Sequence, residues 1–334
     1  MKKQPIDIKR NSGFSGEVGT KKDGAIIDMI PLKDKIIVIK EFSVYELVLA
    51  DTIDPKRTNI DLPTNVQKLI IDQGAESEIV SRTLLISKRL FDPEFFEKDL
   101  NLEKALSLSV ELLHELYFLK KEIEKFLTDE EKEIEKFKKK QASSSFTLPS
   151  ITDVLTRTTT IFQKTDHLEQ IMIELTLIFY PDYGLNKQSH FPKLLEIIEK
   201  RYGSEDEFTL FLSSTLEFMK LIRNLRNCLD HRLDFVSVND FELNSDSIIY
   251  KPSIELEFKD TILQKVSLSI FLPEVEENII TIFEILILHL CAKNVSHPIM
   301  DYSIKEIPLE KRENKFIRYS YWLPIGNKGY FHQL

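Results

Sequence analysis

Glycine and cysteine are scarce in this sequence, and each scarcity excludes a class of protein. Only 9 of the 334 residues are glycine, which argues against glycine-rich sandwiches and barrels and favours a mostly helical chain. The two cysteines, Cys228 and Cys291, lie in apolar helical stretches. Two buried thiols in a reducing cytosol are therefore expected, rather than the single disulfide that the count would allow.

Positive charge is also in short supply. Lysine and arginine number 45 against 54 acidic residues, and the net charge of −9 gives no overall attraction to nucleic acid or to an anionic membrane. Any phosphate-bearing partner must therefore be held by a local group of basic residues.

No apolar run is long enough to cross a membrane. The most apolar stretch, residues 279–292, contains Glu284 and His289 and is shorter than the roughly 20 residues that a spanning helix needs. We expect a buried core helix there and no membrane partner. The polar residues after Met1 predict no signal peptide, so the chain is expected to be cytoplasmic.

The first part of the chain predicts a small β element followed by long helices. Residues 36–39 and 44–49 are rich in β-branched and apolar side chains and predict two strands, although the second also fits a short helix. Apolar positions recur at a helical period in residues 64–73, 76–90 and 102–127, which predicts three helices.

A repeated pentapeptide indicates that the last of these helices is longer. Glu-Ile-Glu-Lys-Phe occurs at residues 122–126 and again at 133–137. Because eleven residues make close to three helical turns, both copies fall on one face of a continuous helix. A capping box at 128–131 could restart the helix instead, but the repeat favours one helix.

The serine-rich residues 142–149 are the best linker candidate. We therefore expect an N-terminal sensing or regulatory domain over residues 1–141.

The second part of the chain predicts a helical bundle that contains a β-hairpin. Helical periods cover residues 153–179, 192–201, 206–229 and 276–291. Between the third and fourth of these helices, apolar and polar residues alternate at 254–258 and 266–270 around a turn at Lys259-Asp260, with 248–251 as a candidate third strand. The predicted fold is thus mainly α, of the α+β kind, with a four-helix domain at 150–295. We expect the aromatic and basic tail, residues 296–334, to pack on that domain in irregular form.

Familiar catalytic and cofactor motifs are missing from the sequence. It has no His-Glu-x-x-His, no clustered cysteines, no Gly-x-Ser-x-Gly and no phosphate-binding loop, so neither a metal nor a cofactor is predicted. His289, on an apolar helix, is interpreted as a core histidine. His167 and His190 have no neighbours of a matching kind.

The chemistry that remains is concentrated in residues 223–232, at the end of the third helix of the bundle. This stretch reads Arg-Asn-Leu-Arg-Asn-Cys-Leu-Asp-His-Arg. Imidazole can move a proton near neutral pH, guanidinium can bind phosphate oxygens, and an amide can orient either group, which suits phosphodiester cleavage without a metal. On an ideal helix Arg226 and His231 point about 140° apart, so they can meet only if the helix ends near Leu229 or if they act across a symmetric partner.

The sequence Arg226-Asn227-x-x-x-His231 resembles the Arg-polar-x-x-x-His motif of the HEPN superfamily, a group of small helical ribonucleases and nucleic-acid-associated domains. The resemblance covers residues 150–295 and implies a four-helix bundle, here with a hairpin between helices three and four. It implies a homodimeric, metal-independent endoribonuclease in which the ribose 2′-OH attacks the adjacent phosphate. Because such proteins often act in toxin–antitoxin, phage-defence or stress systems, RNA and an antitoxin or regulatory protein are the implied partners.

The resemblance also assigns roles to residues. Arg226 would bind phosphate and stabilise transition-state charge, His231 would act as acid or base, and Asn227 would orient one of them. Further substrate contacts would come from three basic residues, namely Lys220, Arg223 and Arg232.

Two points stay open in the sequence. Asp230, beside the histidine, could either orient it or repel phosphate. The domain could instead be an inactive helical module that binds protein or nucleic acid, with Arg226 and His231 bonded to carbonyls at the helix end, where cations are favoured.

Overall fold

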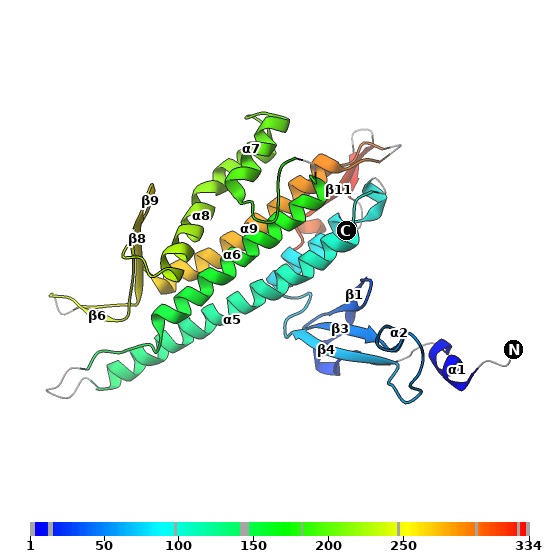
Figure 1. Cartoon of the computed structure of the whole chain (residues 1–334), viewed down its shortest axis with the longest axis horizontal. Helices are drawn as coiled ribbons and strands as arrows, with labels where there is room; N and C mark the ends of the chain where they lie inside the picture. The colour runs from blue at the N-terminus through cyan, green and yellow to red at the C-terminus, as the bar shows by residue number, and fades with distance from the viewer. Residues whose placement is uncertain are drawn as a thin grey trace. The chain divides into compact units, whose positions relative to one another are not determined.

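The computed structural model of this chain describes residues 4–12, 16–96, 99–140, 147–181, 183–245, 248–297, 300–325 and 328–331. They form an α+β protein of antiparallel sheets and long helices (Figure 1). The chain divides into two compact units, Met1–His114 with Leu290–Leu334, and Glu115–His289. This division does not fall at the predicted linker, of which residues 142–146 lie outside the described part.

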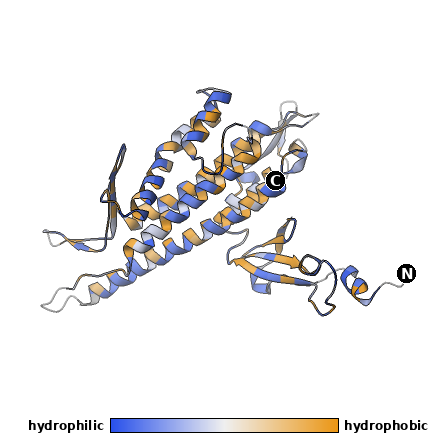
Figure 2. Cartoon of the chain, viewed as in Figure 1, coloured by the Kyte–Doolittle hydropathy of each residue, from blue (hydrophilic) through white to orange (hydrophobic). Residues whose placement is uncertain are grey.

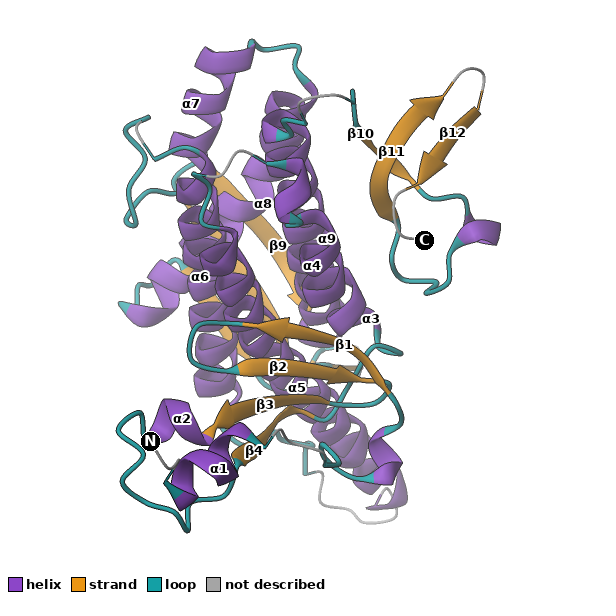
Figure 3. Cartoon of the chain, turned by 90° about the vertical axis from the view of Figure 1, so that its right-hand side faces the viewer, coloured by secondary structure: helices purple, strands orange, loops and turns teal. Residues whose placement is uncertain are grey.

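The first unit contains a four-stranded antiparallel sheet in the order β1-β2-β3-β4 (Figure 3). Its strands are Ile26–Pro31, Ile36–Lys40, Val44–Leu49 and Asn65–Ile71. The short helices α1 (Pro5–Asn11) and η1 (Lys21–Asp23) precede β1, and α2 (Ala50–Ile53) lies between β3 and β4. Ile37, Val38 and Ile39 are buried, as β-branched residues of a central strand usually are. The two strands predicted at 36–39 and 44–49 are confirmed.

The helix predicted at 64–73 is wrong, because β4 covers these residues and pairs with β3. The apolar side chains that suggested a helical period do not form a buried stripe. Val66 and Leu69 are both exposed.

The rest of the first unit joins a helical run to the C-terminal tail. The run consists of α3 (Glu78–Val80), η2 (Ser81–Leu85, a π-helical turn) and α4 (Ile86–Leu90), followed by η3 (Pro93–Phe95). The tail contains β10 (Ser303–Glu306), η4 (Leu309–Lys311), β11 (Tyr319–Ile325) and β12 (Lys328–Phe331), with the strands in one antiparallel sheet. Tyr321 is buried, stacks on Phe95 and donates a hydrogen bond to the Leu90 carbonyl at 2.7 Å.

The tail therefore differs from the irregular segment that we expected on the helical domain. Alternate residues of a strand face the same side, so Tyr319 and Tyr321 share one face of β11, and Tyr321 reaches the core of the first unit.

The second unit is mainly helical. Its helices are α5 (Leu102–Lys140, from Glu115 on), α6 (Val154–Phe179), α7 (Phe191–Tyr202), α8 (Glu207–Asp230) and α9 (Leu268–Asn294, up to His289). They carry both apolar and polar residues along their length (Figure 2), and α8 packs against α6 and α7. Helix α5 runs unbroken through both copies of the pentapeptide, so the prediction of one continuous helix is confirmed.

Small sheets lie between α8 and α9 in the sequence. One has the order β5-β8-β9 (Val236–Asn239, Ser253–Phe258, Thr261–Ser267), and β6 (Glu242–Leu243) pairs with β7 (Ile249–Tyr250). The hairpin is confirmed at β8 and at its turn, where Lys259 adopts a left-handed φ of 57°. Because the chain reverses at once, β9 begins at Thr261 rather than 266, and Leu268 and Ile270 belong to α9.

Among the described residues we find no helix that combines the length and the apolar character of a membrane span. Both cysteines are buried and unpaired, as expected. Burial raises the pKa of the Cys228 thiol and of the Cys291 thiol.

Candidate functional site

The motif lies at the C-terminal end of α8. This helix begins at the N-cap Asp206, whose carboxylate accepts the Phe208 N–H at 3.0 Å, and near its end it buries Ile222, Leu225 and Leu229. It ends at Asp230, and the His231 N–H bonds the Asn227 carbonyl at 3.1 Å. The helix therefore stops close to Leu229, which is one of the two conditions for Arg226 and His231 to act together.

The helix end has the geometry of a Schellman motif. The Leu233 N–H bonds the Cys228 carbonyl at 2.9 Å and the Arg232 N–H bonds the Leu229 carbonyl at 3.2 Å. Arg232 occupies the left-handed position with φ 50°, where glycine is usual. The turn redirects the chain after His231 and leaves that side chain at the surface.

Arg226 is held by acidic partners on two helices. Its Nε lies 2.9 Å from Asp230 Oδ2 and 3.7 Å from Asp166 Oδ2, and its Nη1 donates to Asn227 Oδ1 at 3.0 Å. The side chain is one-third exposed, so solvent reaches part of the guanidinium. A phosphate that binds Arg226 would have to share the guanidinium with these two carboxylates or draw it away from them.

Amide side chains of α6 orient both carboxylates. Gln163 donates to Asp230 at 2.8 Å, and Gln170 donates to Asp166 at 3.0 Å. Gln163, Asp166 and Gln170 have the i, i+3, i+7 spacing of one helix face. Arg226 is thus part of a polar layer between α6 and α8.

His231, unlike Arg226, is not held in place by neighbouring side chains of the described residues. Its side chain is exposed and makes no hydrogen bond or ion pair with any residue that the structure describes. Within one chain the described contacts do not join it to Arg226. The exposed imidazole is free to meet a ligand or a second copy of the chain.

The accessory basic residues fall into two groups. Lys220 is paired with Glu217 at 3.2 Å and lies 4.0 Å from Asp260, so its charge is already matched. Arg223 and Arg232 have no carboxylate partner among the described residues and remain candidates for phosphate contact.

A groove of about 670 Å³ opens beside the motif. Helix α6 contributes Thr156, Thr159, Thr160 and Gln163, and the end of α8 with the following turn contributes Asp230, Arg232 and Asp234, among others. Hydroxyl, amide and guanidinium groups line it together with two carboxylates, so it can bind a polar ligand next to Arg226.

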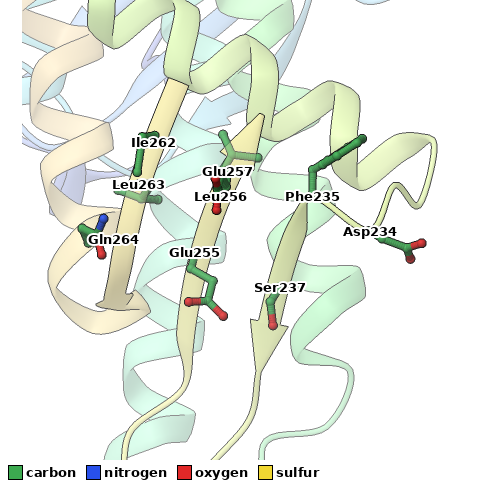
Figure 4. A pocket seen from close by; sticks show the side chains of 9 residues that line it. All are labelled: Asp234, Phe235, Ser237, Glu255, Leu256, Glu257, Ile262, Leu263 and Gln264. Carbon is green, nitrogen blue, oxygen red and sulfur yellow. The ribbon is translucent and has the colours of Figure 1, made fainter. Parts of the chain in front are cut away.

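A second hollow, on the outer face of the β5-β8-β9 sheet, has different chemistry (Figure 4). Its charged side chains are Asp234, Glu255 and Glu257, and Phe235 and Ile262 supply apolar surface. Because the charged side chains that line this hollow are all carboxylates, it is less suited to a phosphate backbone than the groove beside the motif.

Several polar residues of the site belong to no recognisable sequence motif. Gln163, Asp166 and Gln170 form a polar stripe on a helix whose other faces are largely buried, which is the one signal that could have pointed to them. His190, which has no matching neighbour in the sequence, lies 3.3 Å from the Glu169 carboxylate. His289 is a core histidine as interpreted, stacked on Phe208 and Phe211.

Comparisons of this chain with models of known protein families, with curated proteins and with solved structures gave no match.

Proposed function

We propose that residues 150–295 form a HEPN-like domain and that this domain is a metal-independent endoribonuclease, acting as a homodimer in a toxin–antitoxin, phage-defence or stress system. The observation that carries the proposal is the end of α8. There Arg226, which solvent can reach, is followed five residues later by His231, an exposed histidine without a described partner. The order of elements supports it, because α6, α7, α8 and α9 follow one another with the strands inserted between α8 and α9.

Each residue has one role in the proposed reaction. Arg226 binds the scissile phosphate and stabilises the charge that develops on its oxygens, with Asn227 holding the guanidinium through the 3.0 Å bond. His231 takes the proton of the ribose 2′-OH while the 2′ oxygen bonds to phosphorus. The bond from phosphorus to the 5′ oxygen then breaks, and that oxygen leaves with a proton.

A dimer supplies what one chain lacks. The reaction needs a base at the 2′ oxygen and an acid at the 5′ oxygen, and one chain offers a single exposed imidazole in this motif. Two motifs facing each other across a two-fold axis would offer both, together with a second Arg226. The products are a 2′,3′-cyclic phosphate and a 5′-hydroxyl.

The second candidate function is an inactive helical module that binds RNA or a protein such as an antitoxin. The observation that favours it is the pairing of Arg226 with Asp230 and Asp166, since both carboxylates compete with phosphate for the guanidinium.

The test is RNA cleavage in the presence of EDTA by the wild type and by Arg226→Ala and His231→Ala. We expect each substitution to lower the cleavage rate at least about 100-fold, because each removes a group that acts in the transition state. His167→Ala is the matched control. It removes a partly exposed histidine of α6 outside the motif and should leave the rate unchanged.

Equal behaviour of the wild type and both motif variants, with the fold confirmed by circular dichroism, would rule out the nuclease. RNA binding without cleavage in all four proteins would favour the binding module.

A further inference from the structure

A second polar cluster lies next to Arg226, on the other side of Asp166. Asp166 and Glu169 are three residues apart on α6 and share one face of the helix, and His190 is the N-cap residue of α7. One imidazole nitrogen and one oxygen from each carboxylate all lie within 4.8 Å of one another. The exposed fractions of these side chains are 8%, 4% and 22%, so the cluster is largely shielded, with its opening at the histidine.

The histidine is not satisfied by the carboxylate beside it. His190 Nδ1 lies 3.3 Å from Glu169 Oε2, yet Nδ1 is buried and has no hydrogen-bond partner among the described residues. A buried imidazole nitrogen without a partner is uncommon. The geometry leaves Nδ1 and Oε2 available to a third atom.

Both carboxylates are already held in place by other groups. The Phe191 N–H donates to Glu169 Oε1 at 3.1 Å, and Gln170 donates to Asp166 Oδ2 at 3.0 Å. Hydrogen bonds of this kind orient the ligands of metal sites and keep them in one rotamer.

The cluster has less positive than negative charge around it. Within the described ranges, the one lysine or arginine at ion-pair distance of either carboxylate is Arg226, whose Nε is 3.7 Å from Asp166 and closer, at 2.9 Å, to Asp230. Two shielded carboxylates against one shared guanidinium leave an excess of negative charge that is costly to bury.

We infer that Asp166, Glu169 and His190 bind one divalent cation of the zinc type. Nitrogen and carboxylate oxygen together are a donor set that zinc accepts, and three protein ligands leave a fourth position for water. The donors of a tetrahedral site lie about 3.4 Å apart, so the side chains close by roughly 1 Å when the cation binds. The cation links α6 to the start of α7 and neutralises the excess charge.

This inference does not rest on the ribonuclease proposal. The cation site is structural, and its occupancy is measured without any RNA substrate.

The experiment is a titration of the chelator-treated full-length protein with Zn²⁺ by calorimetry, and with Co²⁺ by visible absorption, which reports on ligand number and geometry. We expect one equivalent to bind and the midpoint of thermal unfolding to rise on binding. His190→Gln and Asp166→Asn should each weaken binding at least about 100-fold, since each removes a ligand. His167→Gln, on the same helix, should bind as the wild type does.

His190→Gln is the sharper variant, because the His190 side chain makes no capping hydrogen bond to α7 and its loss should leave the fold intact. Absence of saturable one-equivalent binding to the wild type overturns the inference, whatever the variants do. Undiminished affinity in folded His190→Gln overturns it as well.

Discussion

At the scale of single residues, Arg232 combines a structural cost with a proposed function. It holds the left-handed position of the turn after α8 with φ 50°, a conformation that costs a residue with a Cβ atom about 1 kcal/mol or more. A residue with a Cβ atom is unfavourable in that place, but Arg232 puts a guanidinium at the edge of the groove beside the motif.

Replacing Arg232 separates these two effects. We expect Arg232→Gly to raise the free energy of unfolding by about 1 kcal/mol, because glycine adopts positive φ without strain, and to weaken RNA binding. Arg232→Ala keeps the strain and should lose only the binding. Urea denaturation and an RNA-binding assay on both variants check this. No gain in stability for glycine over alanine would contradict the account of the turn.

The residues of the motif could be identified from sequence, whereas their surroundings could not. The motif spans six consecutive positions, from Arg226 through Asn227 to His231, so a local sequence pattern is enough to find it. Asp166 is sixty residues away, and only the packing of α6 on α8 brings it to Arg226. His190 reaches Glu169 through a loop whose path no helical period predicts.

At the scale of elements, a partly buried charge pair connects α5 to α6. Lys164 donates to Glu115 at 2.6 Å, and His167 lies 3.6 Å from the same carboxylate. Burial would raise the pKa of Glu115, but the hydrogen bond and charge of Lys164, with the charge of His167, outweigh it and lower the pKa below its ordinary value of 4.5.

The lowered pKa sets the pH range in which Glu115 stabilises the fold. A carboxyl with a depressed pKa contributes stability above its ordinary pKa, and the contribution is lost as the pH falls through the folded-state value. Glu115→Gln should therefore cost about 1 kcal/mol at pH 7 and much less at about pH 3, by urea denaturation at both values. Glu124→Gln, an exposed position of α5, is the control. A pH-independent cost would contradict the assignment.

The elements themselves were predictable where one face is buried. The long helices follow an apolar stripe of helical period, and α6, α7 and α8 lie within one residue of their predicted ranges, whereas α9 begins eight residues before its predicted start. β4 was not predictable in this way, because its apolar Val66 and Leu69 are exposed and their spacing fits a helix equally well. The start of β9 depended on the conformation of one residue, Lys259.

At the scale of the whole molecule, the C-terminal strands complete the core of the first unit. We expect Tyr321→Ala to lower the free energy of unfolding of that unit by about 3–5 kcal/mol, because it empties a fully buried position against Phe95. Tyr321→Phe, which keeps the ring but loses the hydroxyl that bonds Leu90 and contacts the Cys291 thiol, should cost about 1 kcal/mol.

The neighbouring Trp322, the single tryptophan of the chain, reports this unfolding by its fluorescence. Tyr330→Ala, at an exposed position in β12 of the same sheet, should change the unfolding free energy by less than about 0.5 kcal/mol. Equal effects at Tyr321 and Tyr330 would show that the tail is no part of the core.

The first unit takes residues from both sides of Glu115–His289. It therefore cannot complete its fold until its C-terminal part has been synthesised. A ribosome adds about 5–20 residues per second, so residues 1–114 wait on the order of ten seconds or more for the strands that cover Leu90 and Phe95. During that interval an apolar surface of the nascent chain is open to chaperones. The second unit, continuous in sequence, can fold first.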